Sequence, residues 1–272
     1  MKKIKVAMIG DVVGRPGRVM IKEHLLKIKE QYKIDFVCAN YENASHGFGL
    51  TLKNCDELLA SGVDVMSGGN HSFDKKELVD LFESRPLLRP HNYPDDMPGS
   101  GLGVYSVGET KIAILNLLGH FSMPMADNPF ILAKKCVDEL QDRGIKHIVV
   151  DMHAEATSEK RALMMMLMGR VSAIVGTHTH VSTDDLQVSS HTGYITDLGL
   201  TGCRDNVIGL DKAAPLKRFL TGLPATFDLP KKCKKILQLV IFELDSDGRC
   251  LGAKKLKIFD DGREIVSDGW ID

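Results

Sequence analysis

The stretch Ile-Val-Gly-Thr-His-Thr-His-Val at residues 174–181 is the part of the sequence from which the fold can be worked out. Its apolar, β-branched start is typical of a buried strand, and the glycine leads into a polar loop. On an extended backbone residues i and i+2 point the same way, so the imidazoles of His178 and His180 can converge on one point. The pair therefore indicates a metal centre, and the alternative is two structural histidines at a strand end.

Other apolar runs also end in polar residues that could join this pair. These predicted strand ends carry Asp11; Glu42 and Asn43; Asn70 and His71; and His153. Open α/β sheets bind their ligands just beyond the C-terminal ends of the strands. Agreement among five strand ends is hard to explain by solubility alone. We therefore predict one metal or catalytic site that collects all of them.

The remaining pattern predicts a mixed α/β fold. Apolar runs typical of strands alternate with amphipathic helical patterns, and they lie at residues 5–9, 35–40, 63–66 and 145–150. A hairpin is predicted from residues 104–107 and 112–117, and two closing antiparallel strands from residues 236–244 and 254–259. No linker long enough to divide the chain is visible, so we expect a single domain over residues 1–272.

Composition limits the class of protein. The chain has 272 residues, of which 43% are hydrophobic and 26% charged, which is ordinary for a globular protein with a large core. Its formal net charge of -1 gives no global attraction to nucleic acid or to membranes. No apolar run reaches the length needed to span a membrane. We expect no membrane partner and no large nucleic-acid surface. A local basic site is left open, and the basic run at residues 231–235 is interpreted as solvated surface.

The cysteines bear on the cellular compartment. They are scattered, without a C-x-x-C pair, at Cys38, Cys55, Cys136, Cys203, Cys233 and Cys250. Such a distribution is typical of reduced thiols rather than of a disulfide framework. We therefore expect a soluble, cytoplasmic protein with six free thiols.

The chemistry of the converging side chains indicates transition metals. Carboxylate oxygen and imidazole nitrogen suit Zn, Mn or Fe, and the absence of cysteine argues against a purely structural zinc site. Apart from His71, the seven potential ligands exceed one tetrahedral centre, but two ions about 3.5–4 Å apart and bridged by a carboxylate would use all seven. Because only Asp11 and Glu42 are charged, two divalent ions would leave a positive site that favours an anionic substrate.

These blocks resemble the calcineurin-like metallophosphoesterases. The motifs that carry the resemblance are Gly10-Asp11, Glu42-Asn43, Gly69-Asn70-His71, the strand end at His153 and the residues 176–180. The longer strings at residues 10–14, 69–74, 153–158 and 196–199 are similar to the bacterial YmdB-like branch over nearly the whole chain. The resemblance implies a metallophosphoesterase-type α/β sandwich, with mixed sheets flanked by helices and a dinuclear metal site at the C-terminal strand ends.

The resemblance also implies a role for each side chain. One ion would be held by Asp11, Asn43 and His180, and the other by Asn70, His153 and His178. Glu42 would bridge the two ions, and His71 would remain free as the general acid. The ions would be divalent transition metals, with iron or manganese favoured over zinc.

Two positions depart from the wider superfamily. Val13 stands where many members have a histidine, and Glu42 stands where most have a bridging aspartate. Both departures belong to the YmdB-like pattern. They leave the first ion with the weaker amide oxygen of Asn43 in place of an imidazole.

The activity that the resemblance implies is hydrolysis of phosphodiesters, notably of 2′,3′-cyclic nucleotides to 3′-nucleotides by attack of a metal-bound hydroxide. The expected partner is a small phosphodiester or nucleotide, and a homo-oligomer is left open. The alternatives are a phosphomonoesterase or nucleotidase that uses the same site, and a non-catalytic, metal-dependent regulator that binds nucleotides. His46 and His91 are further candidates for substrate contacts.

Overall fold

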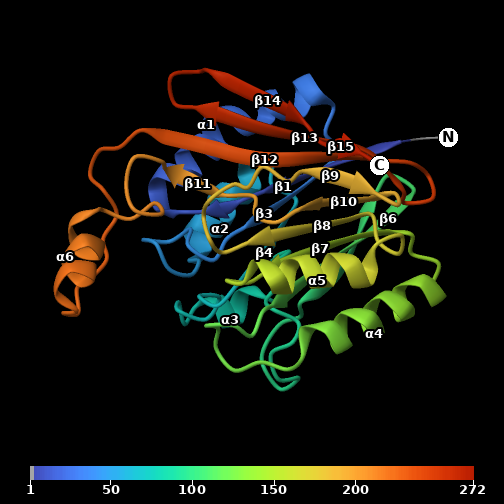
Figure 1. The fold of residues 1–272 in the computed structure, drawn as a ribbon, viewed down its shortest axis with the longest axis horizontal. Coiled ribbons are helices and arrows are strands. Elements are labelled where there is room, and N and C mark those ends of the chain that lie inside the picture. Colours follow the sequence, from blue (N-terminus) through green and yellow to red (C-terminus); the bar gives the residue numbers. More distant parts are fainter. Residues whose placement is uncertain (1–2) are drawn as a thin grey trace.

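The computed structural model describes residues 3–272 and contains two β-sheets that pack face to face, with helices on their outer sides (Figure 1). The first sheet contains β1 (Ile4–Ile9), β2 (Asp11–Val12), β3 (Phe36–Asn40), β4 (Val65–Ser67), β11 (Leu200–Cys203), β12 (Lys235–Leu244), β13 (Cys250–Phe259) and β14 (Glu264–Asp268). The second sheet contains β5 (Leu102–Val107), β6 (Thr110–Leu118), β7 (His147–His153), β8 (Ala173–Thr177), β9 (Gln187–Ser189), β10 (Thr192–Ile195) and β15 (Trp270–Ile271). The helices are α1 (Gly14–Tyr32), α2 (Leu52–Ala60), α3 (Leu78–Leu81), α4 (Pro129–Asp142), α5 (Thr157–Leu167) and α6 (Ala213–Thr221).

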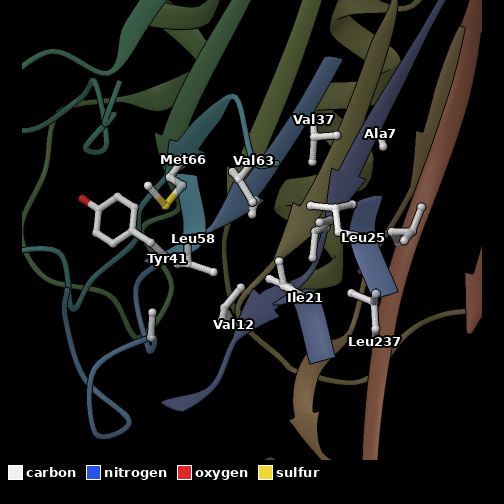
Figure 2. Packing of buried hydrophobic residues seen from close by; sticks show 14 of the residues in the cluster. Ala7, Val12, Ile21, Leu25, Val37, Tyr41, Leu58, Val63, Met66 and Leu237 are labelled. Carbon is white, nitrogen blue, oxygen red and sulfur yellow. The ribbon is translucent and has the colours of Figure 1, made fainter. Parts of the chain in front are cut away.

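Three apolar clusters hold these layers together. One joins α1 and α2 to the first sheet, where Ile21 and Leu25 of α1 contact the same cluster as Val37 of β3 (Figure 2). A second lies between the sheets and includes Val6 of β1 and Val149 of β7. The third covers the outer face of the second sheet with α4 and α5. Burial of one such aliphatic side chain stabilises the fold by about 1.5–3 kcal/mol, so the layers depend on many positions rather than one.

Strand direction brings the expected strand ends together. In the first sheet β1, β3 and β4 are parallel, and in the second sheet β6, β7, β8 and β10 are parallel. The hairpin of β5 and β6 and the antiparallel strands β12 and β13 are confirmed, so both sheets are mixed. The predicted mixed α/β fold is therefore correct, and polar residues from both sheets lie at C-terminal strand ends.

One strand is longer than predicted. The sequence pattern ends it at residue 150, whereas β7 continues through Asp151 and Met152 to His153. All of its residues are buried. Asp151 is accommodated there because its carboxylate accepts hydrogen bonds from the hydroxyls of Ser67 and Thr177, which replace those that water would make.

The expectation of six free thiols is wrong for one pair. Cys203 and Cys233 form a disulfide, with their Cα atoms 5.6 Å apart, a usual spacing for such a bond. The pair escapes a search for short motifs because the two cysteines are 30 residues apart in the sequence. The other four cysteines are free and buried.

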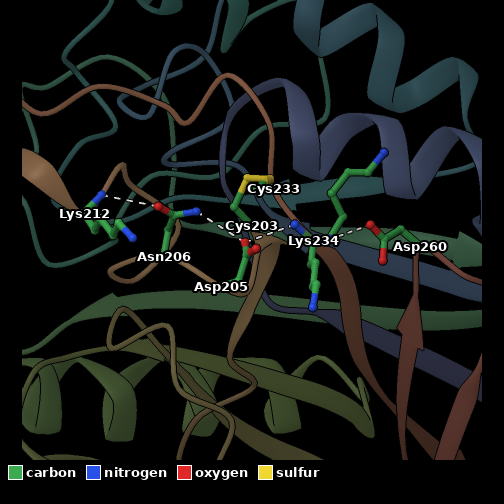
Figure 3. The surroundings of a disulfide bond; sticks show 8 residues. Cys203, Asp205, Asn206, Lys212, Cys233, Lys234 and Asp260 are labelled. Carbon is green, nitrogen blue, oxygen red and sulfur yellow. Dashed lines mark hydrogen bonds between the residues drawn. A yellow bond between two sulfur atoms is a disulfide. The ribbon is translucent and has the colours of Figure 1, made fainter.

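The disulfide closes the neck of an excursion from the first sheet, which we define as residues 204–232. Figure 1 shows that its helix α6 projects away from both sheets. Beside the disulfide, the amide of Arg204 donates to the carbonyl of Lys234 at 2.9 Å. The amide of Lys234 donates to Asp205 at 3.0 Å (Figure 3). The two ends of the excursion are thus held side by side where they leave the sheet.

Within residues 3–272, no helix combines the length and the apolar character that a membrane-spanning segment needs.

Candidate metal centre

All seven expected ligands come together where the C-terminal strand ends of the two sheets meet. One ligand atom from each of Glu42, His153 and His178 lies within 4.8 Å of the other two, and the same holds for Asp11, Glu42 and His180. Glu42 therefore belongs to both groups. The two amides extend them, because Asn70 Oδ1 lies 3.0 Å from His153 Nε2 and Asn43 Oδ1 lies 3.0 Å from His180 Nε2.

The orientation of His153 is set by buried partners. Its Nδ1 lies 2.9 Å from the hydroxyl of Thr177, which donates its own hydrogen to Asp151 Oδ1 at 2.7 Å. Thr177 can therefore only accept from the ring, so Nδ1 is the donor. Asp151 also accepts from Ser67 at 2.5 Å. In the neutral ring this arrangement leaves the lone pair on Nε2, as it must be for a metal ligand.

The lone pair of His153 Nε2 faces other acceptors. Asn70 Oδ1 lies 3.0 Å from it, Glu42 Oε2 lies 3.2 Å away, and His178 Nδ1 lies 3.2 Å away. His178 can give its hydrogen to Glu155, whose carboxylate is 3.0 Å from the other ring nitrogen, Nε2. Several acceptors thus point at one place, and a cation fits there.

The second group has the same character. Asn43 Nδ2 donates to the carbonyl of Gly47 at 2.9 Å, which turns its Oδ1 toward His180. His180 Nδ1 donates to the carbonyl of Ile208 at 2.7 Å, so the neutral ring has its lone pair on Nε2. Asp11 Oδ1 lies 3.9 Å from that nitrogen. Oxygen and nitrogen lone pairs again face each other, which suits an ion between them.

The backbone of the two histidines differs from the expectation. Strand β8 ends at Thr177, and His178 and His180 have φ angles of 100° and 65°, in the left-handed region. The argument from an extended backbone was therefore wrong, and the two rings turn to different groups. Such conformations cost about 1–3 kcal/mol each and persist only where the surroundings stabilise them. Here the Asp11 carboxylate accepts from the amide of His178, and the Asp197 carboxylate accepts from that of Thr179.

A glycine leaves the space that ions would need. A Cβ on Gly69 would lie 2.3 Å from Glu42 Oε2 and 2.4 Å from His153 Nε2. Any larger residue would therefore enter the centre itself. Gly69 belongs to the motif that resembles the metallophosphoesterases, and this contact gives a physical reason for it.

The buried charges strongly perturb one another. Burial raises the pKa of Asp11 to about 6. Burial alone would raise the pKa of Glu42, but the charge of His153 opposes it and lowers the value to about 2. Burial and the charge of His153 lower the pKa of His178 to about 3. Burial alone would lower the pKa of His153, yet Glu42 and Asp11 raise it to about 9. Without an ion, a proton on His153 supplies part of the missing positive charge.

His71 lies beside the centre without belonging to either group. Its amide donates to Glu42 Oε2 at 3.1 Å, and its Nδ1 lies 2.8 Å from Asp74 Oδ2. The ring packs edge-on against Phe48, and its side chain remains 31% exposed. The aspartate holds one ring nitrogen, so the other is available to a bound molecule.

Sequence reasoning missed the residues that orient the ligands and His71. Asp74 and Glu155 stand within the motifs quoted for the resemblance, so their positions were a usable signal. The Ile208 carbonyl left no signal in the sequence, because a residue of any type at this position could supply a backbone carbonyl. Of the two additional histidines, His91 accepts from the amide of Gly101 at 3.2 Å and so has a structural partner.

The chain is similar to known proteins over nearly its whole length. The profile of the YmdB-like protein family matches residues 7–256. The chain is 42% identical over 260 residues to a 2′,3′-cyclic-nucleotide 2′-phosphodiesterase of Bacillus subtilis (strain 168), covering 95% of this chain and 98% of the relative. The crystal structure of a novel phosphatase from Mycoplasma pneumoniae superimposes with a TM-score of 0.88 at 35% identity, covering 99% of this chain and 95% of the other.

A more distant structure shows the fold alone. A putative 5′-nucleotidase from Staphylococcus aureus has a TM-score of 0.57 at 14% identity, over 92% of this chain and 52% of the other. The family profile and the high coverage of the Bacillus relative extend the agreement to nearly the whole sequence. The chain belongs to the YmdB-like family.

Proposed function

We propose that this protein is a metal-dependent phosphodiesterase that hydrolyses 2′,3′-cyclic nucleotides to 3′-nucleotides. The observation that carries the proposal is the pair of ligand groups that share Glu42, each with nitrogen and oxygen lone pairs facing one another. The name of the Bacillus relative supports the substrate.

In this proposal Asp11, Asn43 and His180 would hold one divalent ion, and Asn70, His153 and His178 would hold the other. Glu42 would contribute its carboxylate to both sites. Imidazole and oxygen ligands suit iron, manganese and zinc alike, with iron or manganese favoured. Bound ions would polarise the phosphoryl oxygens and lower the pKa of a water molecule, so that a nucleophile is available near neutral pH.

His71 acts as the general acid. Its Nδ1 is engaged by Asp74 at 2.8 Å, so the other ring nitrogen can deliver a proton to the leaving 2′ oxygen. A ribose alkoxide needs that proton, whereas nitrophenolate leaves with little help. Because the ring does not join either ligand group, its removal spares the ions.

The test is His71→Ala, assayed on a 2′,3′-cyclic mononucleotide and on bis(nitrophenyl) phosphate. General acid catalysis contributes about 10²–10⁴-fold, so kcat/KM on the cyclic nucleotide falls by about that factor. The loss on the nitrophenyl ester is much smaller, and metal content is unchanged. An equal loss on both substrates would assign His71 to positioning, and a loss of metal would make it a ligand.

The regiochemistry has a separate test. Phosphorus NMR of the product distinguishes a 3′-phosphate, which the proposal requires, from a 2′-phosphate. Turnover of monoesters only would favour the phosphomonoesterase alternative, to which the name of the Mycoplasma phosphatase points. The cytoplasmic location, the single domain and the oligomeric state stay predictions.

A further inference from the structure

Two cavities beside the start of α1 are lined by basic side chains. The first, of about 640 Å³, is lined by Arg15, Arg18, Lys22 and Lys53, together with His46. The second, of about 670 Å³, is lined by Arg15 and by the lysines at positions 231, 232 and 235. We call the two cavities together the basic groove, because Arg15 belongs to both.

Most of these cations lack an acidic partner. Arg18 pairs with Glu57 at 2.8 Å, which uses the only carboxylate that lines the first cavity. Among residues 3–272, no hydrogen-bond or ion-pair partner is found for the side chains of Arg15, Lys22, Lys53, Lys231 or Lys232. Glu23 lines the second cavity without cancelling its charge. A protein of net charge -1 thus concentrates unpaired positive charge in one place.

The basic groove begins beside the metal centre. The amide of Gly14 donates to the carbonyl of Asn43 at 2.8 Å, and Arg15 is the next residue along the chain. On the other side, Arg18 Nη1 donates to the carbonyl of Ala44 at 2.6 Å, and His46 follows in the same loop. The loop that carries a proposed metal ligand therefore also forms the edge of the first cavity.

The excursion supplies Lys231 and Lys232, which line the second cavity. Leu229 lies against Gly14, where an added Cβ would come within 2.2 Å of its methyl group. Leu229 and Cys233 both line the second cavity, so the disulfide anchors the segment that presents Lys231 and Lys232. The disulfide and the contact of Leu229 with Gly14 therefore hold the lysines of the excursion beside the cations at the start of α1.

We infer that the substrate is the 3′ end of a short single-stranded RNA that terminates in a 2′,3′-cyclic phosphate, with its upstream phosphates in the basic groove. The inference rests on the proposed function and names its substrate class. A cyclic mononucleotide has one phosphate, which the metal centre holds, and it would leave the groove cations unneutralised. An RNA chain adds one phosphate for each further nucleotide, and cations along a groove bind such a backbone without reading its sequence.

The reaction at the end of the chain is a hydrolysis. Water adds to phosphorus, the bond between phosphorus and the 2′ oxygen breaks, and the 2′ oxygen takes a proton. The RNA then ends in a 3′-phosphate and a free 2′-hydroxyl, and its length is unchanged. No oxidant or further reactant is needed. The expectation of no large nucleic-acid surface followed from the overall charge, which does not record how folding gathers the cations.

The experiment compares a pentaribonucleotide that ends in a 2′,3′-cyclic phosphate with the matching cyclic mononucleotide, using metal-loaded protein. The variants are Lys22→Ala/Lys53→Ala and Lys231→Ala/Lys232→Ala. The control is Lys27→Ala/Lys111→Ala, which removes two exposed lysines that line neither cavity. We expect each groove variant to lose roughly tenfold in kcat/KM on the pentamer, with the mononucleotide and the control unaffected.

Salt dependence gives a second measurement. Each lost phosphate contact lowers the slope of log affinity against log salt by about 0.7 for a single strand, so a double variant lowers it by about 1.4. Binding of a fluorescent pentaribonucleotide 3′-phosphate, followed by anisotropy, reports this slope without requiring turnover.

The outcomes separate the two proposals. If both substrates are hydrolysed equally well and the groove variants match the control, the RNA inference is overturned while the phosphodiesterase proposal stands. If neither substrate is hydrolysed, the phosphodiesterase proposal fails, and anisotropy then tests whether the basic groove binds RNA. If the groove variants bind the pentamer as tightly as the unmodified protein does, the RNA inference is overturned.

Discussion

The two halves of the proposed metal centre are held in different ways. The strand half, which we define as Asn70, His153 and His178, is anchored by His153 at the end of β7. The loop half, defined as Asp11, Asn43 and His180, has its imidazole oriented by a backbone carbonyl of the excursion, Ile208. The two ligand groups have the same kinds of donor atoms, but different parts of the fold hold them in place.

The supports of the two halves differ in burial. His153 Nδ1 donates to the hydroxyl of Thr177, which in turn donates to Asp151. Both Thr177 and Asp151 are almost completely buried within the second sheet. Ile208 is 47% exposed and lies in the excursion whose neck the disulfide closes. Segments with few buried contacts open at lower free energy than core strands. The strand half should thus be the more rigid of the two.

The largest expected effect comes from Glu42, because this carboxylate belongs to both halves. Glu42→Gln removes the shared negative charge, so both ions bind more weakly and the distinction between the halves disappears. We expect occupancy to fall from about two ions per chain to below one, with activity falling in parallel. Elemental analysis and isothermal titration with Mn²⁺ measure this. A variant that keeps one ion at full affinity would contradict a bridging role.

Gly69→Ala tests whether the space beside Glu42 must stay open for the ions to bind, because the substitution adds a Cβ there. Its Cβ would lie 2.3 Å from Glu42 Oε2 and 2.4 Å from His153 Nε2. We expect loss of metal while the fold is retained, which circular dichroism can verify. Gly252→Ala is the control, since nothing lies within 4 Å of a Cβ added there.

The sequence predicted the strand half better than the loop half. Buried apolar runs marked β4, β7 and β8, because the burial of parallel strands leaves a clear pattern. The polar side chains that follow these runs lie close together in the structure. The supports of the loop half left weaker signals: the disulfide joins cysteines 30 residues apart, and Ile208 contributes only its backbone. No sequence signal indicated the left-handed conformations of His178 and His180, since these depend on acceptors that are distant in the sequence.

The next prediction separates the two halves. Asp151→Ala removes the carboxylate that orients His153 through Thr177 but leaves the loop half untouched. Loss of such an outer partner typically costs 10–100-fold in metal affinity. We expect one ion to be weakened by that factor and the other to bind normally. Asp64→Ala is the control, because Asp64 accepts from the amide of Val37 away from the metal centre. Equal weakening of both ions would show that the halves are not independent.

A third difference concerns protons. In the metal-free protein Glu42 and Asp11 outweigh burial and raise the pKa of His153 to about 9, so an ion must displace a proton at pH 7. Affinity in the strand half should therefore fall about tenfold for each pH unit below 9. In the loop half burial raises the pKa of Asp11 only to about 6, so this carboxylate stays ionised between pH 7 and 9.

Titrations in buffers of different ionisation enthalpy measure the protons released on binding. We expect release of about one proton for the ion of the strand half at pH 7.5. The same shift stabilises the metal-free fold below pH 6.5, and that stabilisation is lost as the pH rises through about 9. Ion binding that is independent of pH in both halves would contradict the assignment of the proton to His153.

The smallest effect on activity is expected from the disulfide, and it should appear in the loop half alone. Cys203→Ser/Cys233→Ser opens a loop closed over 30 residues, for which chain entropy predicts a loss of about 3–4 kcal/mol in stability. Part of this loss falls on the excursion, so the Ile208 carbonyl orients His180 less firmly and the ion there binds a few-fold more weakly. Hydrogen exchange should show faster exchange in residues 204–232, while β7 and β8 stay protected. The control is Cys136→Ser, a free buried thiol on α4 far from the excursion. If the strand half weakened as much as the loop half, the excursion would be supporting the whole centre rather than one side of it.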